Sequence, residues 1–194
     1  MKRILLGLIF LGLPVAGRAA MIDELDAAQQ AQLKNGQVVV TAADIAGFVW
    51  PKLTLYKIVN ASPAQMMALF ADYAAAPGYT PNMVSAVVTA TPKPNVKNVR
   101  YTVRVPVLGT ISYDVENTFS KNKVTWDLIQ SPLAKSSTGS LRVEPYGDNQ
   151  TLFSYTNLVE PVTKMAALLK GQARNEAVAT INAISSEAEK RAGR

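Results

Sequence analysis

Alternation of apolar and polar residues marks the middle of the chain. Over residues 98–106, 109–120 and 123–130, every second side chain is apolar or aromatic, and most of those between are charged or hydroxylated. A period of two predicts half-buried β-strands. The apolar register contains Val99, Tyr101, Val103, Val105, Ile111, Tyr113, Val115, Phe119, Val124, Trp126 and Leu128, with Asn117 among them. Because the opposite register is polar, we expect a sheet that is covered on one face only.

Turn residues divide this β-rich region into further strands. Runs near residues 83–91, 136–145 and 150–159 are bounded by Pro, Gly, Asn and Ser. Together with the three strands above, these short connections predict a six-stranded antiparallel meander. Residues 38–40 and 51–60 predict two strands ahead of it.

Helical signals interrupt and close the β-rich region. Residues 62–65 (SPAQ) form a capping box with proline at the first helical position, and Pro77 is expected to end this helix. Residues 22–33 predict another short helix, ended by Asn35-Gly36. The last segment, from 161 to about 191, predicts a helix of about 27 residues, which would be about 40 Å long and able to cross a sheet. Its apolar stripe is Met165, Leu169, Ala173, Ala177, Ile181 and Ile184.

The first twenty residues have the features of a signal peptide. Lys2-Arg3 precedes an apolar run over residues 4–17, and Gly17-Arg18-Ala19 supplies small residues for cleavage. The run is shorter than the roughly 20 residues of a membrane span, although an uncleaved anchor remains the alternative. We therefore expect a signal peptide (1–20), an N-terminal helical segment (21–36) and one α+β domain (37–191).

Composition limits the cellular compartments and the classes of partner that we expect for this protein. The absence of cysteine excludes a disulfide framework, a thiolate metal site and a lipid-attached N-terminus, so we expect a periplasmic or secreted protein. Without Lys2, Arg3 and Arg18, the net charge of +6 falls to +3 (17 basic and 14 acidic residues). The basic residues are scattered, which argues against nucleic acid and leaves room for weak contact with a membrane surface.

One sequence motif and the order of the predicted helices and strands resemble those of a known superfamily. "FADYAAAPGYTPNMVSAVV" places Asp72, Tyr73, Pro77, Tyr79 and Pro81 as in the "DY-x-x-x-P-x-(Y/F)-x-P" signature of START and polyketide-cyclase proteins. "LVEPVTKM" is similar to that family's entry into its closing helix, and "QLKNGQVVV" resembles the lead-in of its exported bacterial branch. The similarity extends to coenzyme-Q-binding proteins of the START type.

This resemblance implies a helix-grip fold. In such a fold, a strongly bent antiparallel sheet of about six to seven strands wraps a long C-terminal helix, and short helices after the first strand cap one end. Family members keep an internal cavity between sheet and helix. The resemblance therefore implies an exported protein that binds or carries a hydrophobic small molecule, such as a lipid, isoprenoid, quinone or sterol-like compound.

Residue types limit the chemistry. The chain has no histidine, which removes the commonest general base and metal ligand, so we expect no catalytic residue, metal or cofactor. Asp114 and Glu116 share the polar face, where we expect them to be solvated. Gly171 lies inside the last helix, where it either makes room for a ligand or another backbone, or marks a kink.

The candidate ligand-binding residues are inward-facing aromatic and apolar side chains with one cation. Tyrosine and tryptophan suit a ligand carbonyl or hydroxyl, although each is also an ordinary core residue. The candidates are Tyr73, Tyr79, Tyr101, Val103, Tyr113, Val115, Trp126, Leu128, Tyr155, Met165, Leu169 and Arg174. Two alternatives stay open: a cyclase or dehydratase of the same fold, and an interaction module in which residues 21–36 dock on a partner protein.

Overall fold

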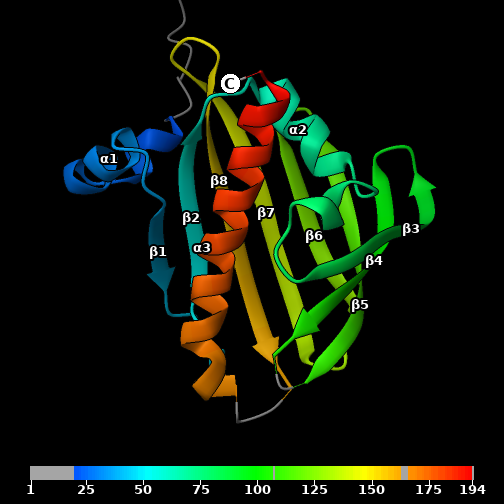
Figure 1. Ribbon diagram of the computed structural model, residues 1–194. Coiled ribbons are helices and arrows are strands. Elements are labelled where there is room, and N and C mark those ends of the chain that lie inside the picture. The colour runs from blue at the N-terminus through cyan, green and yellow to red at the C-terminus, as the bar shows by residue number, and fades with distance from the viewer. Residues whose placement is uncertain (1–19, 107, 163–165, 194) are drawn as a thin grey trace, which may run out of the picture.

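The alternating segments of the chain form one curved antiparallel sheet (Figure 1). The computed structural model describes residues 20–106, 108–162 and 166–193. Its strands are β1 (Val39–Ala43), β2 (Lys52–Val59), β3 (Met83–Lys93), β4 (Val96–Val105), β5 (Gly109–Ser120), β6 (Lys123–Gln130), β7 (Ala134–Tyr146) and β8 (Gln150–Pro161). Their order in the sheet is β1-β2-β8-β7-β6-β5-β4-β3, so the meander from β3 to β8 is confirmed.

The sheet has eight strands among the described residues, more than the six to seven that the resemblance implies. Residues of β1 pair with β2 along its whole length, from Val39 opposite Tyr56 to Ala43 opposite Lys52. This pairing adds β1 as an edge strand. Pairing of β2 with β8 brings the first and last parts of the β region together, and the C-terminal helix lies beside both strands (Figure 1).

In the described part of the chain, five helical segments accompany the sheet. They are the short 3₁₀ turns η1 (Met21–Glu24) and η2 (Ala76–Gly78) and the helices α1 (Ala27–Lys34), α2 (Pro63–Ala71) and α3 (Ala166–Arg191). The capping box at α2 is confirmed, because Ser62 accepts from the Gln65 amide and Gln65 accepts from the Ser62 amide. Helix α2 ends at Ala71, earlier than Pro77, because Asp72 leaves the helical conformation and its carboxylate accepts from the Ala75 amide.

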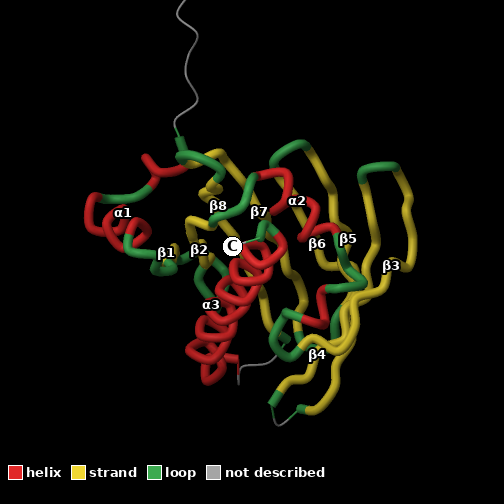
Figure 2. Tube along the Cα trace, turned by 45° about the horizontal axis from the view of Figure 1, so that its top comes forward, coloured by secondary structure: helices red, strands yellow, loops and turns green. Residues whose placement is uncertain are grey.

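Helix α3 lies in the palm of the sheet, and the α2–η2 segment covers the end nearer β5 and β6 (Figures 1 and 2). The 26 residues of α3 give this helix a length of about 39 Å. This is the helix-grip arrangement that the sequence predicts. Pro161, the first residue of the expected closing segment, still belongs to β8, and the helix begins at Ala166.

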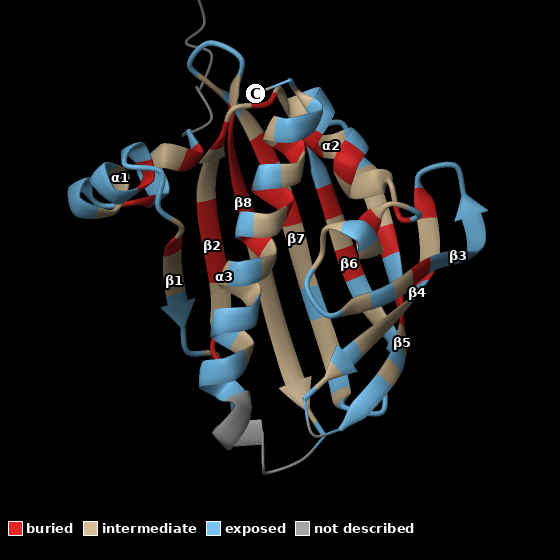
Figure 3. Ribbon diagram, viewed as in Figure 1, coloured by how far each residue is buried: buried red, intermediate tan, exposed pale blue. Residues whose placement is uncertain are grey.

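The packed core is confined to one half of this palm (Figure 3). Among the residues of α3 whose burial is described, from Lys170 on, the buried ones lie in the C-terminal half: Ile181, Ile184, Ser185 and Ala188. They pack with Leu55, Phe153 and Met66 of β2, β8 and α2. Between Lys170 and Thr180 no residue of α3 is buried. The helix is therefore anchored at its C-terminal end.

The N-terminal segment corrects two expectations. The helix predicted over 22–33 is split, because Asp26 caps a new helix by accepting from the Gln29 amide. The segment also covers part of the outer face, so the sheet is not covered on one side only. Met21, Leu25 and Leu33 pack on Val39, Tyr56 and Leu152, whose side chains point away from α3.

Asp114 is a further correction. It lies on the outer face of β5, but it is buried rather than solvated. Its carboxylate accepts from Arg100 Nε and Nη2 at 2.7 and 2.8 Å and from Gln130 Nε2 at 2.7 Å. These hydrogen bonds hold the pKa of Asp114 below its usual value. Asp114 therefore links β4, β5 and β6 and has no catalytic geometry.

Candidate ligand-binding cavity

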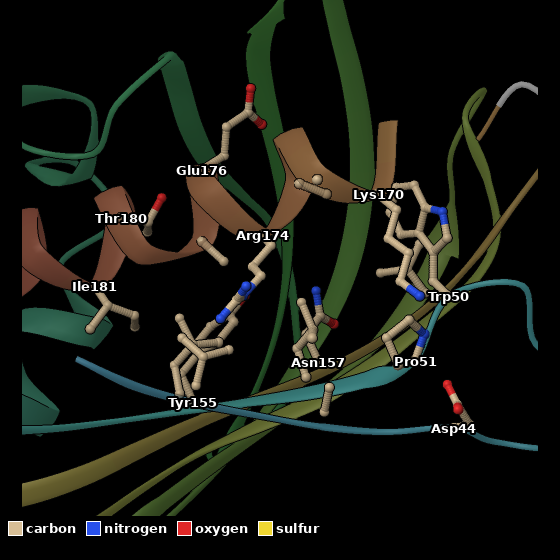
Figure 4. A pocket seen from close by; sticks show the side chains of 18 residues that line it. Asp44, Trp50, Pro51, Tyr155, Asn157, Lys170, Arg174, Glu176, Thr180 and Ile181 are labelled. Atoms are coloured by element: carbon tan, nitrogen blue, oxygen red, sulfur yellow. The ribbon is translucent and has the colours of Figure 1, made fainter. Parts of the chain in front are cut away.

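Two adjoining pockets open between α3 and the sheet. The larger has a volume of about 870 Å³ and lies between α3 and β1, β2 and β8 (Figure 4). The smaller, about 380 Å³, lies between α3, the α2–η2 segment and β4 to β6. Tyr155, Asn157, Glu176 and Thr180 line both pockets, so the two are neighbouring parts of one interior space. Volumes of about 300–1,000 Å³ are usual for small-molecule sites.

Small residues on α3 explain the larger pocket. Gly171, Ala173 and Ala177 line the pocket from the helix side, while Leu53 and Leu55 line it from β2. A Cβ atom built on Gly171 would meet nothing within 4 Å. Because these side chains are too short to reach the sheet, the apolar stripe leaves a void here instead of forming a core.

Aromatic side chains form the wall and floor of the smaller pocket. The rings of Tyr101 and Tyr113 stack with their centroids 5.5 Å apart, and Tyr73 meets Tyr101 edge-on at 6.2 Å. Trp126 lies 4.9 Å from Tyr155. The ring of Phe70 from α2 also stacks on Trp126, with the ring centroids 6.4 Å apart. Two groups of aromatic rings therefore line the pocket, one on β4 and β5 and the other on β6 and β8.

Cross-strand register brings two asparagines onto this inner face. Asn117 pairs with Trp126, Trp126 with Gly139, and Gly139 with Asn157. Residues that face each other across a ladder point to the same side of the sheet. The row therefore places amide groups on both sides of the indole.

Two tyrosine hydroxyls in the cavity have no hydrogen-bond partner among the described residues. They are those of Tyr113 and Tyr155. Burial raises the pKa of Tyr113 to about 12 and raises the pKa values of Tyr101 and Tyr155 above the ordinary value. All three nevertheless keep accessible surface, because they face the cavity. They stay neutral at physiological pH and can donate hydrogen bonds to a guest.

Asn117 is a second unsatisfied polar group of the cavity. The residue is 2% exposed, and its Nδ2 has no hydrogen-bond partner among the described residues. The Asn117 amide lies close enough to the Tyr101 hydroxyl to lower the pKa of that phenol, which opposes the effect of burial. Its Nδ2 nevertheless makes no hydrogen bond of regular geometry with that hydroxyl. Buried polar groups normally find a partner, so a partner supplied from the cavity would stabilise this site.

The structure brings most of the sequence-predicted residues together. The smaller pocket is lined by Tyr73, Tyr79, Tyr101, Val103, Tyr113, Val115, Trp126 and Tyr155, and the larger by Tyr155 and Arg174. Leu128 packs at the edge of the core and lines neither pocket. Met165 lies outside the described residues, as does the side chain of Leu169.

Sequence reasoning missed several lining residues. Asn157 and Thr180 line both pockets, and Asn117 and Phe70 line the smaller one. A signal was present for Asn117, since a polar residue in the apolar register of a strand faces the interior. No local signal marks Asn157, because its facing depends on the pairing of β8 with both β2 and β7.

Ionisable groups of the cavity do not form a catalytic pair. Asp44 and Glu176 are the carboxylates that line the larger pocket, and Glu176 accepts from Gln172 on its own helix. Within residues 20–106, 108–162 and 166–193, no group of three or more Asp or Glu residues is placed to hold a metal ion. No helix in the same ranges is long and apolar enough to span a membrane.

The family profile described as polyketide cyclase / dehydrase and lipid transport matches residues 51–190, well over half of the chain. The chain belongs to this family. The match spans β2 to α3, and hence both pockets. None of the curated proteins compared with this family member is significantly similar to it in sequence.

Solved structures confirm the fold of this family member. A STAR-related lipid transfer protein from Xanthomonas axonopodis superposes with a TM-score of 0.69 and 10% identity, over 78% of this chain and 93% of that one. The ZhuI aromatase/cyclase from Streptomyces sp. R1128 gives 0.66 and 16%, over 73% and 94%. The lipid transfer and protein localization domain of human StarD13 gives 0.61 and 9%, over 88% and 98%. At these identities the likeness concerns the fold.

Proposed function

We propose that this protein binds a hydrophobic small molecule, such as a lipid, isoprenoid, quinone or sterol-like compound, between α3 and the sheet and carries or presents it. One observation carries the proposal. Tyr113 and Tyr155 lie deep in the protein, yet they face free space and lack hydrogen-bond partners within the described structure. The lipid transfer proteins among the structural neighbours support it.

The energetics of such a complex are favourable without strong polar contacts. Removing about 300 Å² of apolar ligand surface from water gives on the order of 7 kcal/mol before association costs are subtracted. Leu53 and Leu55 would contact the apolar body of the ligand. The free phenols and the Asn117 amide would orient its polar group.

Binding of the neutral dye N-phenyl-1-naphthylamine tests this proposal. Thr180 lines both pockets, so Thr180→Trp should fill the space and weaken dye binding by roughly tenfold or more. Asn182→Trp, two positions further along α3 at an exposed site outside both pockets, is the matched control and should bind like the wild type. Ala177→Phe gives a second, smaller filling variant, and circular dichroism checks that each variant folds. Dye binding that neither filling variant weakens would contradict the proposal.

A cyclase or dehydratase activity is the alternative, and the ZhuI aromatase/cyclase among the structural neighbours favours it. Such an enzyme needs an acid and a base across the pocket. Asp44 and Glu176 form no such pair, and the raised pKa of Tyr113 makes its phenol a poor base. Incubating a bound compound with the protein distinguishes the two functions. A carrier returns the compound with its mass unchanged, whereas a dehydratase removes water from it.

We also propose that the protein is exported. The sequence of residues 1–20 supports this, and those before residue 20 lie outside the described structure. Expression of the full chain in a Gram-negative host, followed by N-terminal sequencing, tests it. Periplasmic protein that begins at Ala20 or Met21 is expected. Cytoplasmic protein that retains Met1 would contradict export.

Weak contact with a membrane surface is the last part of this proposal. Leu108, Leu133 and Val162 are exposed in the β4–β5 and β6–β7 connections and after β8, at the end of the molecule where α3 begins. Val162 donates its amide to the Leu133 carbonyl, so these two residues are neighbours. Leu133→Glu should reduce sedimentation with anionic vesicles, whereas Val87→Glu, on the exposed part of β3, should not. Equal sedimentation of both variants and the wild type would contradict this contact.

A further inference from the structure

The arginines of the described structure fall into two groups, those with ion pairs outside the pockets and those without ion pairs that line a pocket. Arg100, Arg142 and Arg191 line neither pocket, and each is ion-paired at 2.7–2.8 Å. Arg104 and Arg174 each line a pocket, and neither side chain forms an ion pair or hydrogen bond with a described residue. A guanidinium that faces a partly apolar pocket without a counter-ion favours an oxyanion as partner.

Arg174 is the better placed of the two. Lys170 lies one turn before it on α3, lines the same pocket and is also without an ion pair in the described ranges. Figure 4 shows the Arg174 side chain extending from α3 toward Tyr155 on the floor of the pocket. Arg174 and a free phenol therefore border the same part of the pocket, whereas Lys170 extends toward Trp50 and Pro51 at its other end (Figure 4).

The carboxylates of this pocket leave Arg174 unneutralised. Glu176 points away from Tyr155 in Figure 4, and its carboxylate accepts from Gln172 Nε2 at 3.0 Å. Asp44 lies toward the opposite end of the pocket, beyond Pro51, and forms no ion pair with Arg174 or Lys170. The positive charge at this wall of the cavity is therefore available to a ligand.

We propose that the ligand is an amphipathic anion whose oxyanion head group, a carboxylate or a phosphate, binds Arg174. Its apolar body then contacts Val40, Leu53 and Leu55 of β1 and β2, all of which line the same pocket. This inference rests on the proposed function and names the class of ligand that the site selects. Arg174 is accordingly a specificity-determining residue, because a neutral analogue retains all the apolar contacts and loses only the charged one.

Competition against N-phenyl-1-naphthylamine with three probes tests this inference on the mature protein. Palmitate carries a carboxylate, hexadecyl phosphate carries a phosphate, and methyl palmitate offers nearly the same apolar body without charge. The wild type should bind at least one anionic probe roughly tenfold more tightly than the ester. The stronger of the two anions identifies the head group.

Substitutions assign the preference to a residue. Arg174→Gln should abolish the preference, so that the anionic probe and methyl palmitate bind about equally, and Arg174→Lys should restore part of it. Lys121→Gln, in the exposed turn between β5 and β6, controls for loss of a distant charge and should retain the preference.

Two kinds of failure are distinguishable. Equal affinity for the ester and both anions, or loss of preference in Arg104→Gln instead of Arg174→Gln, overturns the assignment of Arg174 and leaves the carrier function standing. Failure of the dye and all three probes to bind overturns the carrier function itself, and this inference with it.

Discussion

Trp126 lies directly against the backbone of Gly139. A Cβ atom at position 139 would lie 2.3 Å from the indole ring of Trp126 and equally close to the Thr156 carbonyl oxygen. No side chain larger than hydrogen fits without displacing the indole. Because Trp126 also contacts Phe70 and Tyr155, Gly139 determines where the aromatic floor of the cavity lies.

Gly139→Ala should therefore be destabilising, by about 1–3 kcal/mol for an overpacked interior site. It should also shift tryptophan emission and weaken dye binding, because the indole must move. Urea denaturation and fluorescence measure these effects. Gly78→Ala is the control, since a Cβ there meets nothing within 4 Å. Equal stability of the two variants would show that Trp126 does not depend on Gly139.

Glu24 should hold the N-terminal segment on the sheet. Its carboxylate accepts from Arg142 Nη1 and Nη2 at 2.8 and 2.7 Å and from the Tyr56 hydroxyl at 2.8 Å. We expect Glu24→Gln to speed hydrogen exchange in α1 and to leave exchange in the β5–β6 hairpin unchanged. Unaltered exchange in α1 would mean that Met21, Leu25 and Leu33 hold the segment without the ion pair.

The same ion pair gives a pH dependence. Hydrogen bonding from Arg142 lowers the pKa of Glu24 below its value in the unfolded chain. A carboxyl with a depressed folded pKa contributes stability above the unfolded pKa and loses it as pH falls through the folded pKa. The stability advantage of the wild type over Glu24→Gln should thus be full at neutral pH and shrink below about pH 4.5. An advantage independent of pH would contradict this assignment.

Gly171→Ala distinguishes the two roles expected for this glycine, which are making room for a ligand and marking a kink in α3. The position is helical and its added Cβ meets open space, so alanine should stabilise α3 by about 1 kcal/mol. Thermal denaturation of the ligand-free protein measures this gain. Dye affinity that stays unchanged would show that the ligand does not use the space beside Gly171, whereas weaker binding would place the ligand there. A loss of stability would contradict the continuous helix described above.

Local signals carried the prediction of the fold. The capping box at Ser62 and Gln65 requires only neighbouring residues, and the alternation through Tyr101 and Tyr113 requires only a period of two. Both are encoded within short windows, so α2 and the central strands follow from the sequence. The split at Asp26 was missed because its cap competes with a helical pattern that is otherwise continuous.

The cavity could be expected only from resemblance. Ala173 and Ala177 lie on an apolar stripe that predicts core packing, and whether they reach the sheet depends on its curvature. Curvature and register arise from pairing between distant strands, as in the row from Asn117 to Asn157. The N-terminal segment covers the outer face where β2 lies beside β8. That pairing of distant strands brings Tyr56 and Leu152 together under Met21, so it could not be predicted locally either.

Native mass spectrometry of protein purified without denaturant tests the central claim most directly. If α3 and the sheet enclose a site for a hydrophobic guest, part of the protein should carry a discrete added mass. The Thr180→Trp variant should lose this adduct and the Asn182→Trp variant should keep it. Wild-type protein that has only the mass of the bare chain, and that stays empty after incubation with a total lipid extract, would contradict the claim.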